Sequence, residues 1–170
     1  MGTWYNVKKQ GESMIDYIAR SEGIDRARIV DHVARIDAAY LAIATDCGAV
    51  VGAVVVITHD RSNGTIGLKF MDESMGPYYW DMPDRILDKL TPTTYQHAIA
   101  WRLGCRSFNL RKKALKGDLT GKRLRIGSGV YRIQGRNSYR RGAWIGTYEE
   151  TGIQYTIRRS ALNRAEIVEG

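Results

Sequence analysis

The chain contains three strand-like runs set so close together that they can pair only with their neighbours. Apolar and β-branched residues fill 28–36, 39–45 and 49–58, and two or three residues separate each run from the next. Gaps this short close hairpins, whereas parallel pairing needs a crossover of a dozen residues or more. A fourth run, 64–70, follows an Asn63-Gly64 turn. We therefore expect an antiparallel meander of about four strands.

Helical patterns flank this meander. Residues 11–20 have the periodicity of an amphipathic helix, and 83–90 begins with a proline that suits the first turn of a helix. A longer helix is expected over 95–116. Gly104 weakens its middle and is a point where it can break. Its core-facing residues are expected to be Ile99, Leu103 and Leu110.

Short strand patterns fill the last third of the chain. Their turns contain Gly, Asn or Ser. The runs are 123–126, 129–133, 143–148, 153–158 and 165–168. Five short strands in this space favour a small SH3-like β-barrel. The fold class expected is α+β, with a domain over 1–116 that holds the antiparallel sheet and its helices, and a small basic barrel over 117–170.

Charge separates the two ends of the chain. Residues 1–100 hold 10 Lys and Arg against 13 Asp and Glu, whereas residues 101–170 hold 16 against 5. From Arg102 to Arg141 there are 13 basic residues and one acid, Asp118. Such a block is typical of a surface that meets a polyanion. Nucleic acid is the predicted partner, and charge alone does not distinguish DNA from RNA.

The basic block also contains aromatic residues. Residues 136–142 form a predicted loop from which arginines reach phosphates and a tyrosine stacks on unpaired bases. Tyr131 and Trp144 are further candidates for stacking. An acidic protein partner and a solvated basic face are the alternatives. The predicted nucleic-acid-binding residues are Arg102, Arg106, Lys112, Lys113, Lys122, Arg123, Arg136, Tyr139, Arg140 and Arg141.

The segment 69–81 is the densest in side chains capable of chemistry. Asp72 and Glu73 are adjacent carboxylates at the end of a predicted strand, where they can divide acid and base roles or hold a divalent metal. Within a regular strand they would point to opposite faces. Asp-Glu before Ser-Met-Gly-Pro is also ordinary turn chemistry. The catalytic candidates are Asp72, Glu73 and Tyr78.

This segment and its surroundings resemble a family of phage and integrative-element proteins built on a domain of unknown function. In that family a Lys-x-Met-Asp-Glu-x-x-Gly-Pro block precedes a Pro-x-x-Ile-Leu helix, as in 69–77 and 83–87 here. The resemblance covers about residues 1–105, and the chain departs from it at its start, with Thr3 before Trp4. It implies a mobile-element setting and a polar cluster at Asp72 and Glu73, but no activity.

Several residue types argue against other classes of protein. Cys47 and Cys105 lack metal-ligand spacing and are expected as buried thiols in a reducing cytoplasm. The three histidines have no ligand spacing either, so no metal site is expected. The start lacks a signal-peptide pattern, and the longest apolar stretch is half the length of a membrane span. We therefore expect a protein of the bacterial cytoplasm that makes no membrane contact, with no cofactor identified.

Three functions remain open from the sequence. The leading one is a phage or mobile-element accessory protein that binds nucleic acid or a nucleoprotein through its basic C-terminal module. The second is a nucleic-acid-modifying or hydrolysing enzyme that uses Asp72 and Glu73. The third is an inhibitor that binds a host defence protein.

Overall fold

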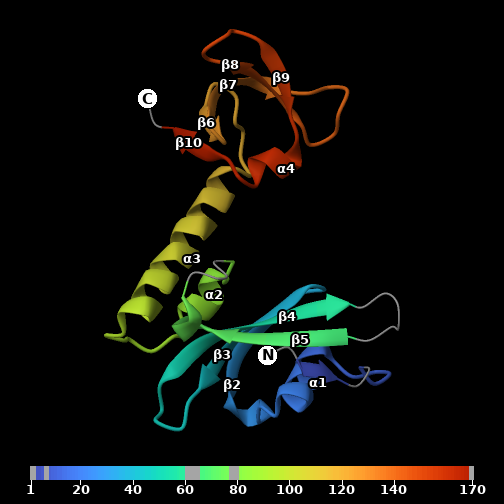
Figure 1. Cartoon of the computed structure of the whole chain (residues 1–170), viewed down its shortest axis with the longest axis vertical. Coiled ribbons are helices and arrows are strands. Elements are labelled where there is room, and N and C mark those ends of the chain that lie inside the picture. The colour runs from blue at the N-terminus through green and yellow to red at the C-terminus, as the bar shows by residue number, and fades with distance from the viewer. Residues whose placement is uncertain (1–2, 6–7, 60–65, 77–80, 169–170) are drawn as a thin grey trace. The chain divides into compact units, whose positions relative to one another are not determined.

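The structure is a computed structural model that describes residues 3–5, 8–59, 66–76 and 81–168, without the side chains of 3–5, 58–59 and 66–67 (Figure 1). The chain divides into two compact units, Met1–Asn109 and Leu110–Gly170. This division falls seven residues before the predicted boundary at 116. Leu115 packs against the core of the second unit, so the last turn of the connecting helix belongs there.

The first unit contains an antiparallel sheet with the strand order β1-β5-β4-β3-β2. Its strands are β1 (Thr3–Tyr5), β2 (Ile29–Ala34), β3 (Ala38–Ala44), β4 (Val50–His59) and β5 (Ile66–Asp72). The four predicted meander strands are confirmed. The short strand β1 was not predicted, and it pairs with β5. The predicted Asn63-Gly64 turn lies outside the described residues.

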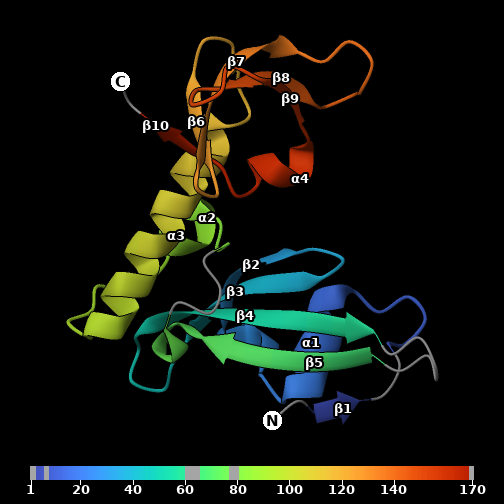
Figure 2. The same cartoon turned by 45° about the horizontal axis from the view of Figure 1, so that its top comes forward.

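Helices cover both faces of this sheet, as Figures 1 and 2 show. On one face lies α1 (Met14–Glu22), which packs Ile15, Tyr17 and Ile18 against β3 and β4. The other face is covered by α2 (Asp84–Leu87) and the first half of α3 (Gln96–Ala114). Because both faces are covered, β3 is buried at six consecutive positions. Two 3-10 turns, η1 (Arg26–Arg28) and η2 (Glu73–Met75), complete the unit.

The start of α1 lies three residues after the start of the predicted helix over 11–20. The Ser13 side chain accepts a hydrogen bond from the backbone N–H of Asp16 and caps the first turn. The helix ends at Gly23, whose φ of 66° is in the left-handed region that favours glycine. Capping therefore sets both ends of this helix.

The core-facing side of α3 differs from the prediction. The helix is continuous through Gly104, and Leu103 and Leu110 are 62% and 69% exposed. The buried residues are Ala98, Trp101 and Cys105. A Cβ on Gly52 of β4 would lie 3.1 Å from the Trp101 ring, so the missing side chain makes room for the indole. That contact fixes which side of the helix faces the sheet.

The second unit also contains an antiparallel sheet, with the strand order β10-β6-β7-β8-β9. Its elements are β6 (Arg123–Ile126), β7 (Gly129–Arg136), β8 (Trp144–Tyr148), β9 (Gln154–Ile157), α4 (Arg159–Leu162) and β10 (Glu166–Val168). The five predicted strands are confirmed, and α4 was missed. The core includes Leu124, Ile133, Trp144 and Ile157.

The fold class is α+β, with helices packed on antiparallel sheets. The expected SH3-like barrel is not what the second sheet shows: no ladder joins β9 to β10 in the described residues, so the sheet is open. No helix in the described part of the chain has both the length and the apolar character needed to cross a bilayer.

The two thiols have different surroundings, which corrects the expectation that both are buried. Cys47 is exposed in the turn between β3 and β4. The Thr45 hydroxyl, 3.0 Å from its Sγ, lowers the pKa of Cys47. Cys105 is buried on the core-facing side of α3, and burial raises its pKa to about 12.

We expect iodoacetamide to alkylate Cys47 at pH 8 and to leave Cys105 unmodified in the folded protein, because the thiolate is the reacting species. Mass spectrometry of the proteolytic peptides measures both sites. In concentrated guanidinium chloride both thiols should react, which provides the control. Rapid labelling of Cys105 in the folded protein would contradict its burial.

Candidate nucleic-acid interface

The two carboxylates of the predicted catalytic site have separate surroundings. Asp72 ends β5 and caps η2: its Oδ1 accepts hydrogen bonds from the backbone N–H of Ser74, at 2.9 Å, and from the Ser74 hydroxyl. Glu73 follows and is buried. Tyr78, the third catalytic candidate, lies outside the described residues. The strand does end here, as the hypothesis of a shared site requires, but the two acids have different partners.

Glu73 forms a two-pronged ion pair with Arg102 of α3. Its Oε2 accepts from Arg102 Nε at 2.8 Å and its Oε1 from Nη2 at 2.9 Å. The Arg102 Nη1 also donates to the Thr91 carbonyl at 2.6 Å. The Glu73 and Arg102 side chains are only 7% and 18% exposed. The pair therefore joins three segments of the first unit, and its charges neutralise each other.

The described side chains near this pair do not assemble an acid–base or metal site. Of the three histidines, His32 and His97 are described in full, and neither hydrogen-bonds to Asp72 or Glu73. No group of three His, Cys, Asp or Glu side chains able to hold a metal occurs among the described residues. The geometry at Asp72 and Glu73 is that of a capped turn and a structural ion pair.

We expect Glu73→Gln to lower the free energy of unfolding by about 3 kcal/mol, because it leaves the Arg102 guanidinium buried without a counter-charge. Urea unfolding followed by circular dichroism measures the loss. Asp72→Asn is the matched control: it removes the same charge one residue away, while the Asn oxygen still accepts from Ser74, so the change should stay below about 1 kcal/mol. Equal stability of the two variants would contradict a structural role for Glu73.

Arg106, a second predicted phosphate ligand on α3, is also paired within the first unit. Its Nη2 lies 2.9 Å from Asp88 Oδ1, and its Nη1 lies 3.7 Å from Asp84 Oδ1. Arg102 and Arg106 are therefore both paired with acids of their own unit. Only Arg102 is buried in its pair; the Arg106 pair is exposed and weak.

The second unit has a large excess of positive charge. Residues 110–170 hold 14 Lys and Arg against 5 Asp and Glu. Glu149 is paired with Arg123, and Glu166 lies 3.3 Å from Arg111. Asp118 accepts hydrogen bonds from Thr120. These bonds, together with the charges of Arg136 and Lys122, lower the pKa of Asp118. The acids of this unit are too few for its cations.

The loop between β7 and β8 has a defined backbone. The Asn137 Oδ1 accepts from the backbone N–H groups of Tyr139 and Arg140 at 2.9 and 3.1 Å. The Asn137 N–H donates to the Ala143 carbonyl and closes the base of the loop. Arg140 and Arg141 are exposed, and Tyr139 is 96% exposed. An ordered loop thus holds two arginines and an aromatic ring in solvent.

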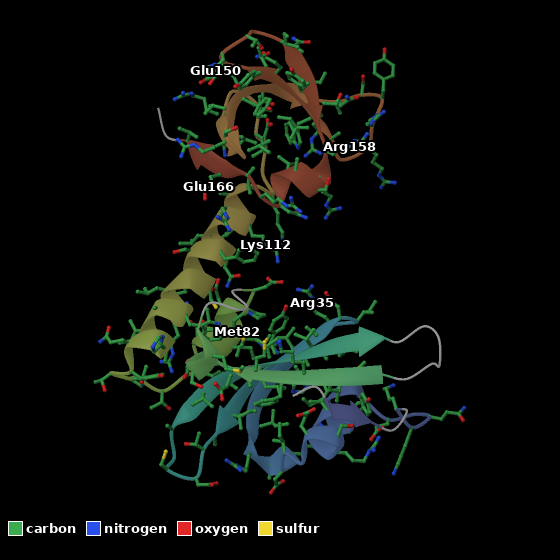
Figure 3. All side chains as sticks on the ribbon, in the orientation of Figure 1. Arg35, Met82, Lys112, Glu150, Arg158 and Glu166 are labelled. Atoms are coloured by element: carbon green, nitrogen blue, oxygen red, sulfur yellow. The ribbon has the colours of Figure 1, made fainter. Side chains whose placement is uncertain are left out.

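Strand register brings further arginines to the same end of the sheet. Arg136 of β7 lies opposite Trp144 of β8, which lies opposite Ile157 of β9. Arg158, labelled in Figure 3, and Arg159 come directly after Ile157, and the base of the loop contacts β9 through Asn137 and Thr156. We call this set the arginine end. It comprises Arg136, Arg140, Arg141, Arg158 and Arg159.

No ion pair involves the arginine end within the part of the chain that the structure describes. Arg136 instead lies over the Trp144 ring, with its guanidinium carbon 4.8 Å from the ring centroid. Trp144 is 4% exposed and belongs to the core, so it is not free to stack on a base as expected. Tyr131 packs against Tyr148 and Tyr155 at the other end of the β7–β8 ladder.

The other predicted ligands are distributed over the second unit. Lys112 and Lys113 are exposed in the last turns of α3, and Lys122 is exposed just before β6. Arg123 donates to both oxygens of Glu149. Sequence reasoning missed Arg158 and Arg159. Their signal was an adjacent pair of arginines at the end of a strand, but only the pairing register places them beside the loop.

Comparison of this chain with protein-family models, with curated proteins and with solved structures finds no match. The resemblance of residues 1–105 to phage and integrative-element proteins therefore stays an expectation.

Proposed function

We propose that this protein binds nucleic acid, or a nucleoprotein, through the arginine end of its second unit. The observation that supports this most is the group of five arginines at one end of the sheet, with no ion-pair partner among the described residues. Guanidinium groups without an ion-pair partner can contact phosphates directly, and each such contact releases counterions from the nucleic acid. The contrast with Arg102, which is buried in its ion pair with Glu73, argues for a role of the unpaired set.

The chemistry of the loop favours nucleic acid over an acidic protein. Tyr139 is almost completely exposed between arginines. An aromatic ring held in solvent by an ordered loop has little to gain from carboxylates, but it stacks well on an unpaired base. Arginines next to such a ring contact the phosphates on either side of that base. The proposal covers both DNA and RNA.

The finer points of fold and setting are part of the same proposal. We propose that the second unit adopts an SH3-like arrangement, because β10 returns to pair with β6 and only a β9–β10 ladder is missing for closure. We also propose that the protein acts in the cytoplasm of a bacterial host as an accessory of a phage or mobile element. The resemblance over residues 1–105 supports this setting.

Removing both loop arginines tests the proposal. We expect Arg140→Gln/Arg141→Gln to weaken oligonucleotide binding at low salt. The slope of log K against log salt should fall by about 1.8 for duplex DNA, since each phosphate contact contributes about 0.9. Fluorescence anisotropy at several salt concentrations measures both quantities.

Arg125→Gln/Arg164→Gln is the matched control for that experiment. It removes the same charge from exposed residues of the second unit that lie outside the arginine end. The control should keep most of the salt slope. Equal slopes in the two double variants, or wild-type affinity that does not change with salt, would contradict the proposal.

The exposed tyrosine gives an independent prediction. We expect Tyr139→Ala to weaken binding of a single-stranded oligonucleotide by about 1 to 3 kcal/mol through lost stacking, with a smaller effect on duplex. Tyr139→Phe keeps the ring and should bind single strands nearly as well as the wild type. Isothermal titration calorimetry measures the difference. Equal losses for single strands and duplex would show that Tyr139 does not stack on bases.

A further inference from the structure

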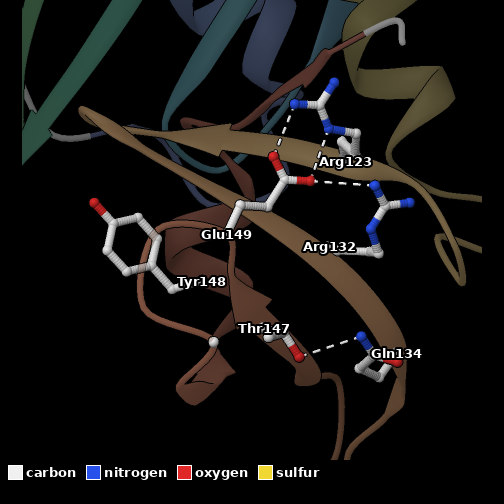
Figure 4. A pocket seen from close by; sticks show the side chains of 7 residues that line it. Arg123, Arg132, Gln134, Thr147, Tyr148 and Glu149 are labelled. Atoms are coloured by element: carbon white, nitrogen blue, oxygen red, sulfur yellow. Dashed lines mark hydrogen bonds and ion pairs between the residues drawn. The ribbon is translucent and has the colours of Figure 1, made fainter.

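A second cationic feature of this unit lies outside the arginine end. It is an open pocket of about 460 Å³. Its lining, drawn in Figure 4, includes Arg123, Arg132, Gln134, Thr147 and Glu149. Arg123 and Arg132 lie directly opposite each other on β6 and β7, and Thr147 lies opposite Arg132 on β8. Arg132 and Gln134 flank the buried Ile133, so they project from the outer face of the sheet.

The Glu149 carboxylate occupies the space between the two guanidinium groups. Its oxygens accept from Arg123 Nε at 2.8 Å and from Arg123 Nη2 at 2.7 Å, and its Oε1 also lies 3.4 Å from Arg132 Nη2. One carboxylate therefore faces two cations, which leaves a net positive charge. We call Arg123 and Arg132 the guanidinium clamp.

We propose that the guanidinium clamp is a phosphate-binding site and that Glu149 occupies it while no ligand is bound. This inference rests on the proposed function and adds a second phosphate-binding place to the arginine end. A carboxylate and a phosphate present equivalent oxygens to the planar fork of an arginine, so one anion can replace the other without any movement of the strands. The phosphate group of a nucleic acid is the ligand expected here.

The surroundings of the clamp support such an exchange. The Arg123, Arg132 and Glu149 side chains are 31%, 55% and 28% exposed, so water and ligand reach all three. Ion pairs with this exposure contribute little to the free energy of folding, so displacement of Glu149 by a ligand costs little free energy. The Thr147 hydroxyl accepts from Gln134 Nε2 at 3.2 Å, so its own proton remains to be donated to a phosphate oxygen.

The clamp is also within reach of a ligand held at the arginine end. Arg132 and Arg136 are four residues apart on β7, which is about 13 Å along a strand. One strand of duplex DNA advances about 3.4 Å per phosphate, so about four phosphates cover this distance. One nucleic acid molecule is therefore long enough to cover this distance. To contact both places it would pass from the outer face, where Arg132 lies, to the side of the sheet on which Arg136 packs against Trp144.

The direct test uses inorganic phosphate and does not depend on nucleic acid. In Glu149→Gln, NMR titration with phosphate should shift the side-chain Nε–Hε signals of Arg123 and Arg132, with at least tenfold tighter binding than in the wild type. Glu149→Gln/Arg123→Gln should lose this gain. The absence of a shift in Glu149→Gln, or of any difference from the wild type, would overturn the proposal, and Glu149→Ala repeats the test with a smaller side chain.

Glu150→Gln is the matched control, because it removes the same charge one residue away. The Glu150 carboxylate accepts from the Tyr148 hydroxyl and is not bonded to the clamp. For an oligonucleotide, Glu149→Gln should steepen the salt slope by about 0.9 or more, whereas Glu150→Gln should not. An equal change of the salt slope in both variants would show that only the net charge matters, and it would contradict the proposal of a phosphate site at the clamp.

The two proposals fail in different ways. Wild-type oligonucleotide binding that depends on Arg140 and Arg141, with no phosphate binding in Glu149→Gln, would remove the clamp and keep the arginine end. Phosphate binding at Arg123 in Glu149→Gln, without oligonucleotide binding by any variant, would keep the clamp as a phosphate site and remove the proposed function.

Discussion

The supply of acidic side chains determines which cations this protein offers to a ligand. In the first unit, the buried Glu73 takes both prongs of Arg102, and Asp84 and Asp88 take Arg106. Burial makes the Glu73 pair obligatory, because either charge alone in that place would be costly. In the second unit the acids are too few: among the described residues the five arginines of the arginine end form no ion pair, and neither do Arg125 and Arg164, which lie outside it. The position of the carboxylates thus explains which arginines keep an unbalanced charge.

The strands were predictable because their signals are local. Period-two patterns and short turns fixed β2 to β5 and β6 to β10 within a few residues of their observed bounds. The buried side of α3 was not predictable in this way. It depends on Gly52, a residue of β4 about fifty positions earlier, which makes room for the Trp101 ring. The leucines that looked like core residues by spacing are exposed as a result.

The candidate site, too, was predictable only where its residues are neighbours in the sequence. The loop arginines 140 and 141 and Tyr139 were found because they are contiguous in the sequence and bounded by turn residues. Arg158 joins them only through the pairing of β8 with β9, which no local pattern reports. Conversely, Arg102 was predicted as a phosphate ligand and Glu73 as a catalytic residue. They pair with each other across 29 positions of the chain, and no local pattern reveals such a contact. A count of charged residues shows that cations exceed acids, but it does not show which cation pairs with which acid.

The distribution of charge in the second unit also has a direction. At one end of the β7–β8 ladder, Arg136 and the loop carry arginines that form no ion pair within the described residues. At the other end Arg123 and Arg132 share Glu149, and Glu150 accepts from the Tyr148 hydroxyl. A polyanion is therefore drawn more strongly to the first end than to the second, where Glu149 and Glu150 offset positive charge. If Glu149 left the guanidinium clamp, as we propose, Arg123 and Arg132 would both be free to contact a phosphate. In the proposed complex, the acid that offsets the positive charge of the clamp would therefore set how far along the sheet a nucleic acid extends.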